Sequence, residues 1–136
     1  MAKAKAKPYP ASLLELMASK TAILLKARTY ADMGMTETAQ PIWAAAASYE
    51  ERIAPQLDLL GRELEAAASR ISAASCYQKG GDLSRAVNLY QAALAAPLLP
   101  HTRQDVAAML AACLDELSRT APDGSSRRGG KVQAGT

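Results

Sequence analysis

The chain of 136 residues has no phenylalanine, one tryptophan and one histidine, and its two cysteines, Cys76 and Cys113, do not form a CxxC pair. These shortages exclude several classes of protein. The aromatic and basic clusters of the usual RNA-binding modules are missing, and so is the grouping of histidine and cysteine that binds zinc. We therefore expect no metal, no cofactor and two free thiols in a reducing cytoplasm.

Long apolar runs are missing as well, because Glu15 and Lys20 interrupt the segment from Leu13 to Leu25. This segment predicts neither a signal peptide nor a membrane span. Valine, isoleucine and threonine are too few for a convincing sheet. The hydrophobic share of 49% consists mostly of alanine and leucine, which are strong helix formers. The composition predicts one all-α domain in the cytoplasm, with no membrane insertion.

Positive charge lies at the two ends of the chain. Residues 1–8 and 119–136 each carry a formal charge of +3, which leaves −3 on residues 9–118. We expect a flexible basic arm over residues 1–11, a helical domain over 12–118 and a disordered basic tail over 119–136, because the tail has almost no large apolar residues. The basic ends predict weak, salt-sensitive attraction to nucleic acid rather than specific recognition.

The ends of the first two helices are predicted from capping residues, glycine and proline. Ser12 followed by Glu15 resembles a capping box and predicts a helix from there to about residue 33. Gly34 suits the residue that ends it. Thr38, rather than Thr36, is expected to cap the second helix, because Pro41 then falls in the first turn, where no amide is needed. Residue 55 is also proline and predicts a kink or break, before a stop near residue 61.

Three further helices are expected. The third covers residues 62–79 and has a flat face of small side chains. The fourth is capped by Asp82 and repeats apolar residues at helical spacing until the proline-flanked run 97–100. The fifth is capped by Thr102 with Asp105 and is amphipathic to about residue 118.

Two stretches of the chain carry aromatic, glycine and small residues at the same relative positions. Such spacing of aromatic, glycine and small residues predicts a helical hairpin that stacks on copies of itself. The matching residues are Tyr30, Gly34, Ala39, Trp43 and Ala46 in one stretch, and Tyr77, Gly81, Ala86, Tyr90 and Ala93 in the other.

Residues 77–98, which read YQKGGDLSRAVNLYQAALAAPL, resemble the tetratricopeptide repeat. The resemblance covers roughly residues 20–98 and implies two stacked helical hairpins, with the fifth helix as a C-terminal cap. Tyr30 and Tyr77 lie 47 residues apart rather than the family's usual spacing of about 34. We therefore expect an irregular stack in which the second helix, or its connection, is longer than usual.

The resemblance also implies a groove for a partner's peptide or helix, lined by the first helix of each hairpin. A solvated helix face is the simpler explanation of the same polar residues, so both interpretations stay open. The family's clamp for a terminal carboxylate is not reproduced, and that ligand is not expected. The positions implied for the groove are Thr21, Leu24, Arg28, Asp32, Ala68, Ile71, Ser75, Gln78 and Lys79.

Catalysis has little support in the sequence. His101 stands alone at an expected helix start, and the paired acidic residues are helical neighbours that do not face each other. We expect no enzyme but an adaptor or scaffold that binds a protein partner. Self-association is expected too, since two repeats are few. The alternative is a structural bundle that its basic tails tether to nucleic acid or to an anionic surface.

Overall fold

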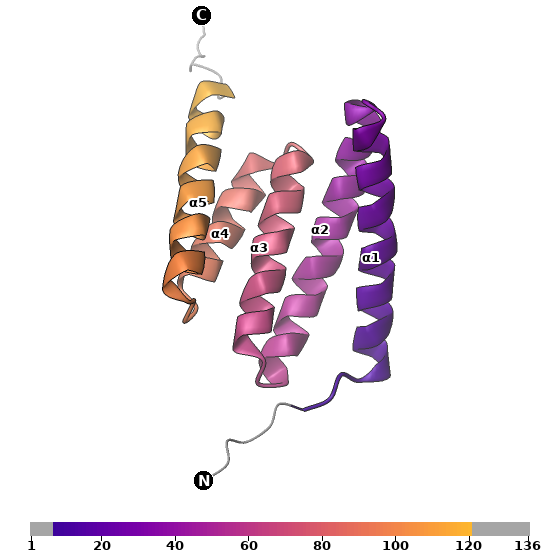
Figure 1. Cartoon of the computed structure of the whole chain (residues 1–136), viewed down its shortest axis with the longest axis vertical. Coiled ribbons are helices and arrows are strands. Elements are labelled where there is room, and N and C mark those ends of the chain that lie inside the picture. Colours follow the sequence, from indigo (N-terminus) through magenta and orange to yellow (C-terminus); the bar gives the residue numbers. More distant parts are fainter. Residues whose placement is uncertain (1–6, 121–136) are drawn as a thin grey trace, which may run out of the picture.

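The structure is a computed structural model that describes residues 7–120, and within this range it contains five helices and no strand. Each helix packs against the next along the chain, as Figure 1 shows. The expected all-α stack of two hairpins and a fifth helix is confirmed. Residues 1–6 and 121–136, on which most of the basic arm and tail was expected, lie outside the described part. The helices are α1 (Ala11–Asp32), α2 (Thr36–Leu59), α3 (Glu63–Lys79), α4 (Leu83–Leu94) and α5 (Pro100–Thr120).

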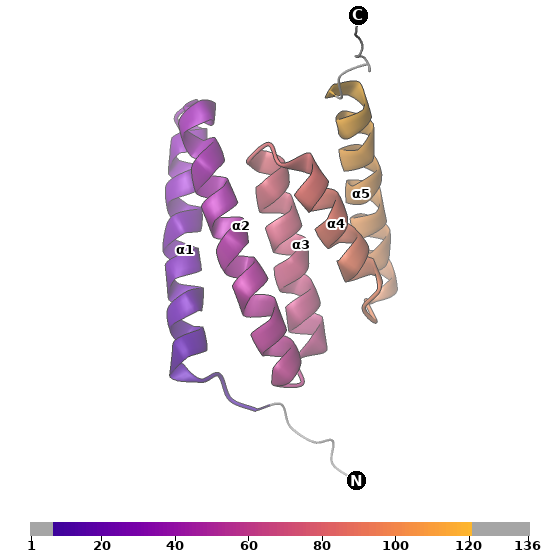
Figure 2. The same cartoon turned by 180° about the vertical axis from the view of Figure 1, so that it is seen from behind.

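The five helices form two layers. Figure 1 looks onto the face that α1, α3 and α5 present, and Figure 2 looks onto α2 and α4 from behind. Short connections make consecutive helices antiparallel, so α1, α3 and α5 run in the same direction. No helix in residues 7–120 is long and apolar enough to cross a membrane.

The first three connections have the same geometry. Each contains a glycine with φ between 76° and 90°, a left-handed conformation that costs other residues more. The glycines are Gly34, Gly61 and Gly81. The next residue donates its amide, at 2.9 Å, to the carbonyl five positions earlier: Met35 to Tyr30, Arg62 to Leu57, and Asp82 to Tyr77. Glycine is therefore required at these three places for one common reason.

Two helices begin earlier than expected, because proline starts them. Helix α1 begins at Ala11, with Pro10 before it in an extended conformation, and Ser12 makes no capping hydrogen bond. Helix α5 begins at Pro100 rather than after Thr102. Proline has a fixed φ and no amide proton to leave unpaired, so it suits the start of a helix without a polar side-chain cap. The Asp82 cap is confirmed, since its carboxylate accepts the amide proton of Arg85 at 3.2 Å.

Helix α2 differs from the expectation at both of its prolines. It begins at Thr36 rather than after Thr38, and it contains Pro41 and Pro55 without a break. The amide of Ala39 already bonds to the carbonyl of Met35 at 3.0 Å, so the turn at Gly34 sets the start. Burial of the apolar face of α2 on its neighbours compensates for the missing amides. The Thr38 cap and the break at residue 55 were wrong predictions.

Small side chains fill most of the core. A main cluster draws on all five helices, and its fully buried alanines let the helices approach closely. A second, smaller cluster lies near the turn between α2 and α3 and comprises Leu13, Ile53, Ala54, Leu57 and Ala66. Helix α2 has 24 residues and α4 has 12, whereas residues 60–62 alone connect α2 to α3. The wide spacing of the repeat therefore arises from a longer second helix.

Residues 7–10, expected to be part of a flexible arm, pack against the turn between α2 and α3. The carbonyl of Lys7 accepts hydrogen bonds from the Arg62 guanidinium at 2.9 and 3.1 Å. The Tyr9 hydroxyl donates to the carboxylate of Glu65, and the Arg62 guanidinium lies 4.4 Å from the centre of the Tyr9 ring. We call this segment the N-terminal strap.

Candidate functional site

A groove of about 290 Å³ runs along the exposed face of α3, between α1 and α5. Helix α3 supplies most of its lining, because the small side chains on this face leave space beside the helix. We call it the α3 groove. Its lining residues are Leu24 and Arg28 from α1, Trp43 from α2, Ala68, Ile71, Ser72, Ser75, Cys76 and Lys79 from α3, and Met109 from α5.

Two cations, Arg28 and Lys79, stand at one end of the α3 groove, and no carboxylate lines it. The ammonium of Lys79 lies 4.6 Å from the centre of the Trp43 ring, a cation–π contact that favours one position of this flexible side chain. Neither cation belongs to an ion pair within residues 7–120. Both charges are therefore free to meet an anion.

Beside the α3 groove lies an apolar hollow of about 180 Å³. It lies between α3 and the connection from α4 to α5, and it shares Ala68 and Ile71 with the groove. Leu64 and Leu99 remain 51% and 56% exposed there. We call it the leucine hollow; its other lining residues are Leu98 and Thr102.

Six of the nine expected groove residues line the α3 groove: Leu24, Arg28, Ala68, Ile71, Ser75 and Lys79. The other three do not line it. Thr21 is exposed and donates its hydroxyl to the carbonyl of Met17 at 2.9 Å. Gln78 points into the protein, where its side-chain oxygen accepts the Tyr90 hydroxyl proton at 3.0 Å. Asp32 is exposed at the end of α1. Ala68, which the resemblance also implied, lies in both the groove and the leucine hollow.

Sequence reasoning missed eight residues that line the groove or the hollow, and three of them, Trp43, Met109 and Leu99, show why. Trp43 belongs to a second helix, yet it lines the groove because its neighbours on α2 are alanines that let the large ring reach between α1 and α3. Met109 lines it because α5 continues the layer of α1 and α3. Leu99 follows a proline after α4, and this position carries no helical periodicity to mark its role. The size of Trp43 within an alanine-rich helix was the one available signal.

A buried charge pair lies close enough to Cys76, which lines the groove, to act on its thiol. Glu50 on α2 is 3% exposed, and its carboxylate lies 3.6 Å from the ammonium of Lys20 on α1. A buried carboxylate is costly unless a cation compensates for it. The Lys20 ammonium therefore compensates the charge of Glu50 and adds no free charge to the groove.

The groove offers little for covalent chemistry. Burial raises the pKa of the Cys76 thiol; the charges of Lys79, Lys20 and Arg28 oppose that rise, and the charge of Glu50 adds to it. A reactive cysteine requires a lowered pKa. His101 is exposed at the start of α5, away from the groove. Within residues 7–120, no three residues of the histidine, cysteine, aspartate and glutamate types are placed to bind a metal ion.

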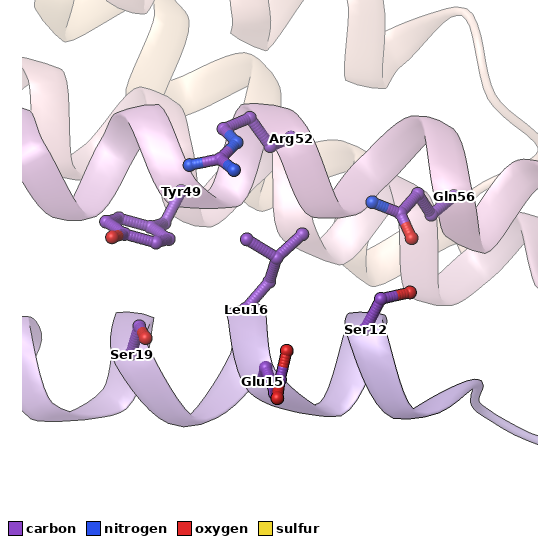
Figure 3. Close-up of a pocket in the computed structure, with 7 residues that line it drawn as sticks. All are labelled: Ser12, Glu15, Leu16, Ser19, Tyr49, Arg52 and Gln56. Atoms are coloured by element: carbon purple, nitrogen blue, oxygen red, sulfur yellow. The ribbon is translucent and has the colours of Figure 1, made fainter.

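Another hollow, larger than the α3 groove, lies between α1 and α2 and measures about 420 Å³. Figure 3 shows the Leu16 side chain pointing toward α2 in its middle, with Tyr49 and Arg52 along α2. The Arg52 guanidinium lies 5.2 Å from the centre of the Tyr49 ring, and Glu15 lines the same hollow. One acidic and one basic side chain thus line this hollow around an apolar side chain.

Comparisons with protein-family models, with curated proteins and with solved structures give no match to this chain.

Proposed function

We propose that this protein is an adaptor or scaffold that binds a peptide or helix of a protein partner in the α3 groove. The observation that carries the proposal is the continuity of the α3 groove with the leucine hollow through Ala68 and Ile71. Together they form one extended, partly apolar surface along a helix. Exposed apolar surface of this kind is typical of protein interaction sites.

The chemistry of the surface favours binding over catalysis. Recognition needs apolar contacts together with a few oriented polar groups, and Trp43, Ile71 and Lys79 supply both. A catalytic groove needs an activated nucleophile or a general base, whereas the thiol of Cys76 has a raised pKa. Short turns also hold α1, α2 and α3 together, so the surface exists before a partner arrives.

The experiment is affinity capture from the native host with three forms of the immobilised protein. Ile71→Arg places a long charged side chain where the groove and the hollow meet. Ser48→Arg adds the same residue at an exposed position of α2 and is the matched control. We expect one set of partner proteins with the wild type and with Ser48→Arg, and its loss with Ile71→Arg.

Circular dichroism and the melting temperature establish that both variants fold. Equal capture by all three folded forms would contradict the proposal, since the partner would then bind elsewhere. Loss with both arginine variants would mean that added charge, rather than a blocked groove, prevents capture. Loss with both variants would therefore also contradict the proposal that the partner binds in the groove.

A further inference from the structure

The α3 groove and the leucine hollow differ in chemistry along the axis of α3. Leu64 stands at the start of this helix and Lys79 at its end. At about 1.5 Å per residue, the two side chains are separated by roughly 22 Å along the helix axis. The Leu64 end is apolar and the Lys79 end is basic, so the surface has a direction.

The basic end stands out against the charge of the rest of the protein. Residues 9–118 carry a formal charge of −3, yet the α3 groove contains two cations and no carboxylate. The ring of Trp43 holds the Lys79 ammonium, so this cation is partly positioned before binding, which reduces the entropy lost on association. The geometry therefore complements an anion at this end.

The apolar end complements branched side chains. Leu64 and Leu99 are large, exposed and close to a hollow of about 180 Å³. Ile71, partly buried, continues the apolar surface toward the groove. A leucine or isoleucine of a partner would remove these side chains from water without leaving a polar group unpaired.

We propose that the partner segment is acidic at one end and apolar at the other, with its carboxylates at Arg28 and Lys79 and its leucine-sized side chains in the hollow at Leu64 and Leu99. This inference rests on the proposed function. An extended segment of about seven residues spans the required 22 Å at roughly 3.3 Å per residue. The protein's own ends do not supply it, because residues 1–8 and 119–136 each carry a charge of +3.

The test is selection from a random peptide library of about twelve residues per member, long enough to span α3 in extended form. The immobilised full-length protein is the target. Selected peptides are synthesised, and their affinities are measured by fluorescence anisotropy. We expect aspartate or glutamate toward one end and leucine, isoleucine or methionine toward the other. The affinity is also expected to fall as the salt concentration rises.

Two charge-reversed forms of the protein test the basic end. Arg28→Glu/Lys79→Glu is expected to weaken binding at least about tenfold. Lys26→Glu/Arg119→Glu makes the same change of net charge at exposed positions outside the groove and is expected to leave the affinity unchanged. A peptide whose acidic residues are replaced by lysine is expected to bind the first variant better than the wild type.

Leu64→Asp tests the apolar end and is expected to weaken binding about tenfold or more, because it removes an apolar contact and places a carboxylate against the apolar end of the segment. Its control is Leu59→Asp, at a side chain that is 80% exposed near the end of α2. Equal losses from the two aspartate variants would contradict the apolar assignment, because net charge alone would then explain them.

The outcomes separate this inference from the proposed function. Selected peptides that are basic, or that bind Arg28→Glu/Lys79→Glu as tightly as the wild type, overturn the inference. If such peptides still lose affinity with Ile71→Arg, the groove function stands. Two outcomes count against both the inference and the proposed function. One is a set of peptides that bind every groove variant equally well, and the other is a library that yields no binder. Displacement of selected peptides by a single-stranded oligonucleotide but not by a second acidic peptide would overturn the protein-partner assignment.

Discussion

The two hairpins share one turn geometry and one spacing of aromatic and small residues but differ in length, and the difference lies far from the turn. Helices α1 and α2 have 22 and 24 residues, whereas α3 and α4 have 17 and 12. In the first hairpin the repeated residues, Tyr30 to Ala46, lie in the halves of α1 and α2 nearest Gly34. In the second hairpin the same set, Tyr77 to Ala93, reaches almost to the end of the shorter α4. The repeat therefore specifies how a hairpin closes, and the length of its helices is set separately.

The added length of the first hairpin carries features that the second hairpin lacks. It contains four of the five residues of the second apolar cluster and Glu50, which pairs with Lys20, and the N-terminal strap lies beside it. Residue 97 lies 47 positions after Glu50 and is therefore its equivalent in the second hairpin. It is a proline beyond the end of α4, so the second hairpin has no counterpart of Glu50. We call this added length of α1 and α2 the extension. It is an addition to a hairpin that is otherwise shared, and mutations can test how much it contributes to stability.

The largest effect is expected from Leu57→Ala, which empties the centre of the second cluster. Leu57 is 1% exposed, and truncation of such a side chain costs about 2–5 kcal/mol. Urea unfolding followed by circular dichroism measures the loss. Leu59→Ala, at an 80% exposed side chain, is the control. A loss no larger than that of the control would show that the extension adds little to the stability of the first hairpin.

Gly80→Ala is expected to rank second and to distinguish the two turns. A Cβ at this position would lie 3.0 Å from the carbonyl oxygen of Gln40 and 3.3 Å from the amide of Ala44, both backbone atoms of α2. The expected cost is about 1–3 kcal/mol, from overpacking. The equivalent residue of the first hairpin is Met33. It is 64% exposed, because no helix precedes α1 to pack against this turn.

Met33→Ala is the control for this comparison and is expected to leave the melting temperature nearly unchanged. If Gly80→Ala were as mild as Met33→Ala, the close approach between the second turn and α2 would not be needed for stacking. Thermal unfolding of the two variants under the same conditions decides between these outcomes.

Lys20→Met is expected to destabilise the extension by about 1–2 kcal/mol, because it leaves the buried Glu50 carboxylate without its cation. This value is below that of a fully buried pair, since the Lys20 side chain is 23% exposed. The double variant Lys20→Met/Glu50→Met is expected to recover much of the loss, because no charge then remains buried. A double variant less stable than Lys20→Met would contradict this account of the pair. Lys26→Met, on the exposed side of α1, is the control.

The smallest effect is expected from Tyr9→Phe, which removes one contact of the N-terminal strap. The hydrogen bond from Tyr9, followed by that from Arg62, lowers the pKa of Glu65 below its ordinary value of 4.5. A group with a lowered pKa stabilises the fold above its unfolded pKa, and this contribution is lost as the pH falls through the folded pKa.

The wild-type strap is therefore expected to loosen in acid, and the pH dependence should be weaker in Tyr9→Phe. The Lys7 amide donates to the carbonyl of Leu60 at 3.4 Å. Its protection from hydrogen exchange, relative to the unfolded rate at about pH 6 and at a pH below the ordinary value of the carboxyl, reports the opening. Identical pH profiles for the wild type and Tyr9→Phe would contradict the role of this hydrogen bond. Tyr49→Phe is the control, since Tyr49 lies away from the strap.

Much of this fold follows from local sequence. Gly34, Gly61 and Gly81 mark the turns, because only one backbone geometry closes them and glycine adopts it at low cost. Helix starts were predicted less well. Side-chain caps at Ser12, Thr38 and Thr102 compete with the nearby prolines and with the preceding turn, and their balance depends on the packing of the whole helix.

The groove was predictable only in part. Helical spacing places Leu24, Arg28 and Lys79 on one side of their helices, but it does not show how helices in different hairpins approach one another. Gln78 occupies a similar position in the sequence and is instead turned inward by its bond to Tyr90. The contribution of Trp43 depends on the gap between α1 and α3, which no local pattern describes.

Trp43 is the single tryptophan of the chain, and it lines the α3 groove beneath the Lys79 ammonium. Its fluorescence is thus a built-in reporter for this one surface. A molecule that displaces Lys79 or covers the ring should change the intensity or wavelength of the emission. Unlabelled wild-type protein can therefore be screened directly, and a bound partner located at the groove before its own structure is known.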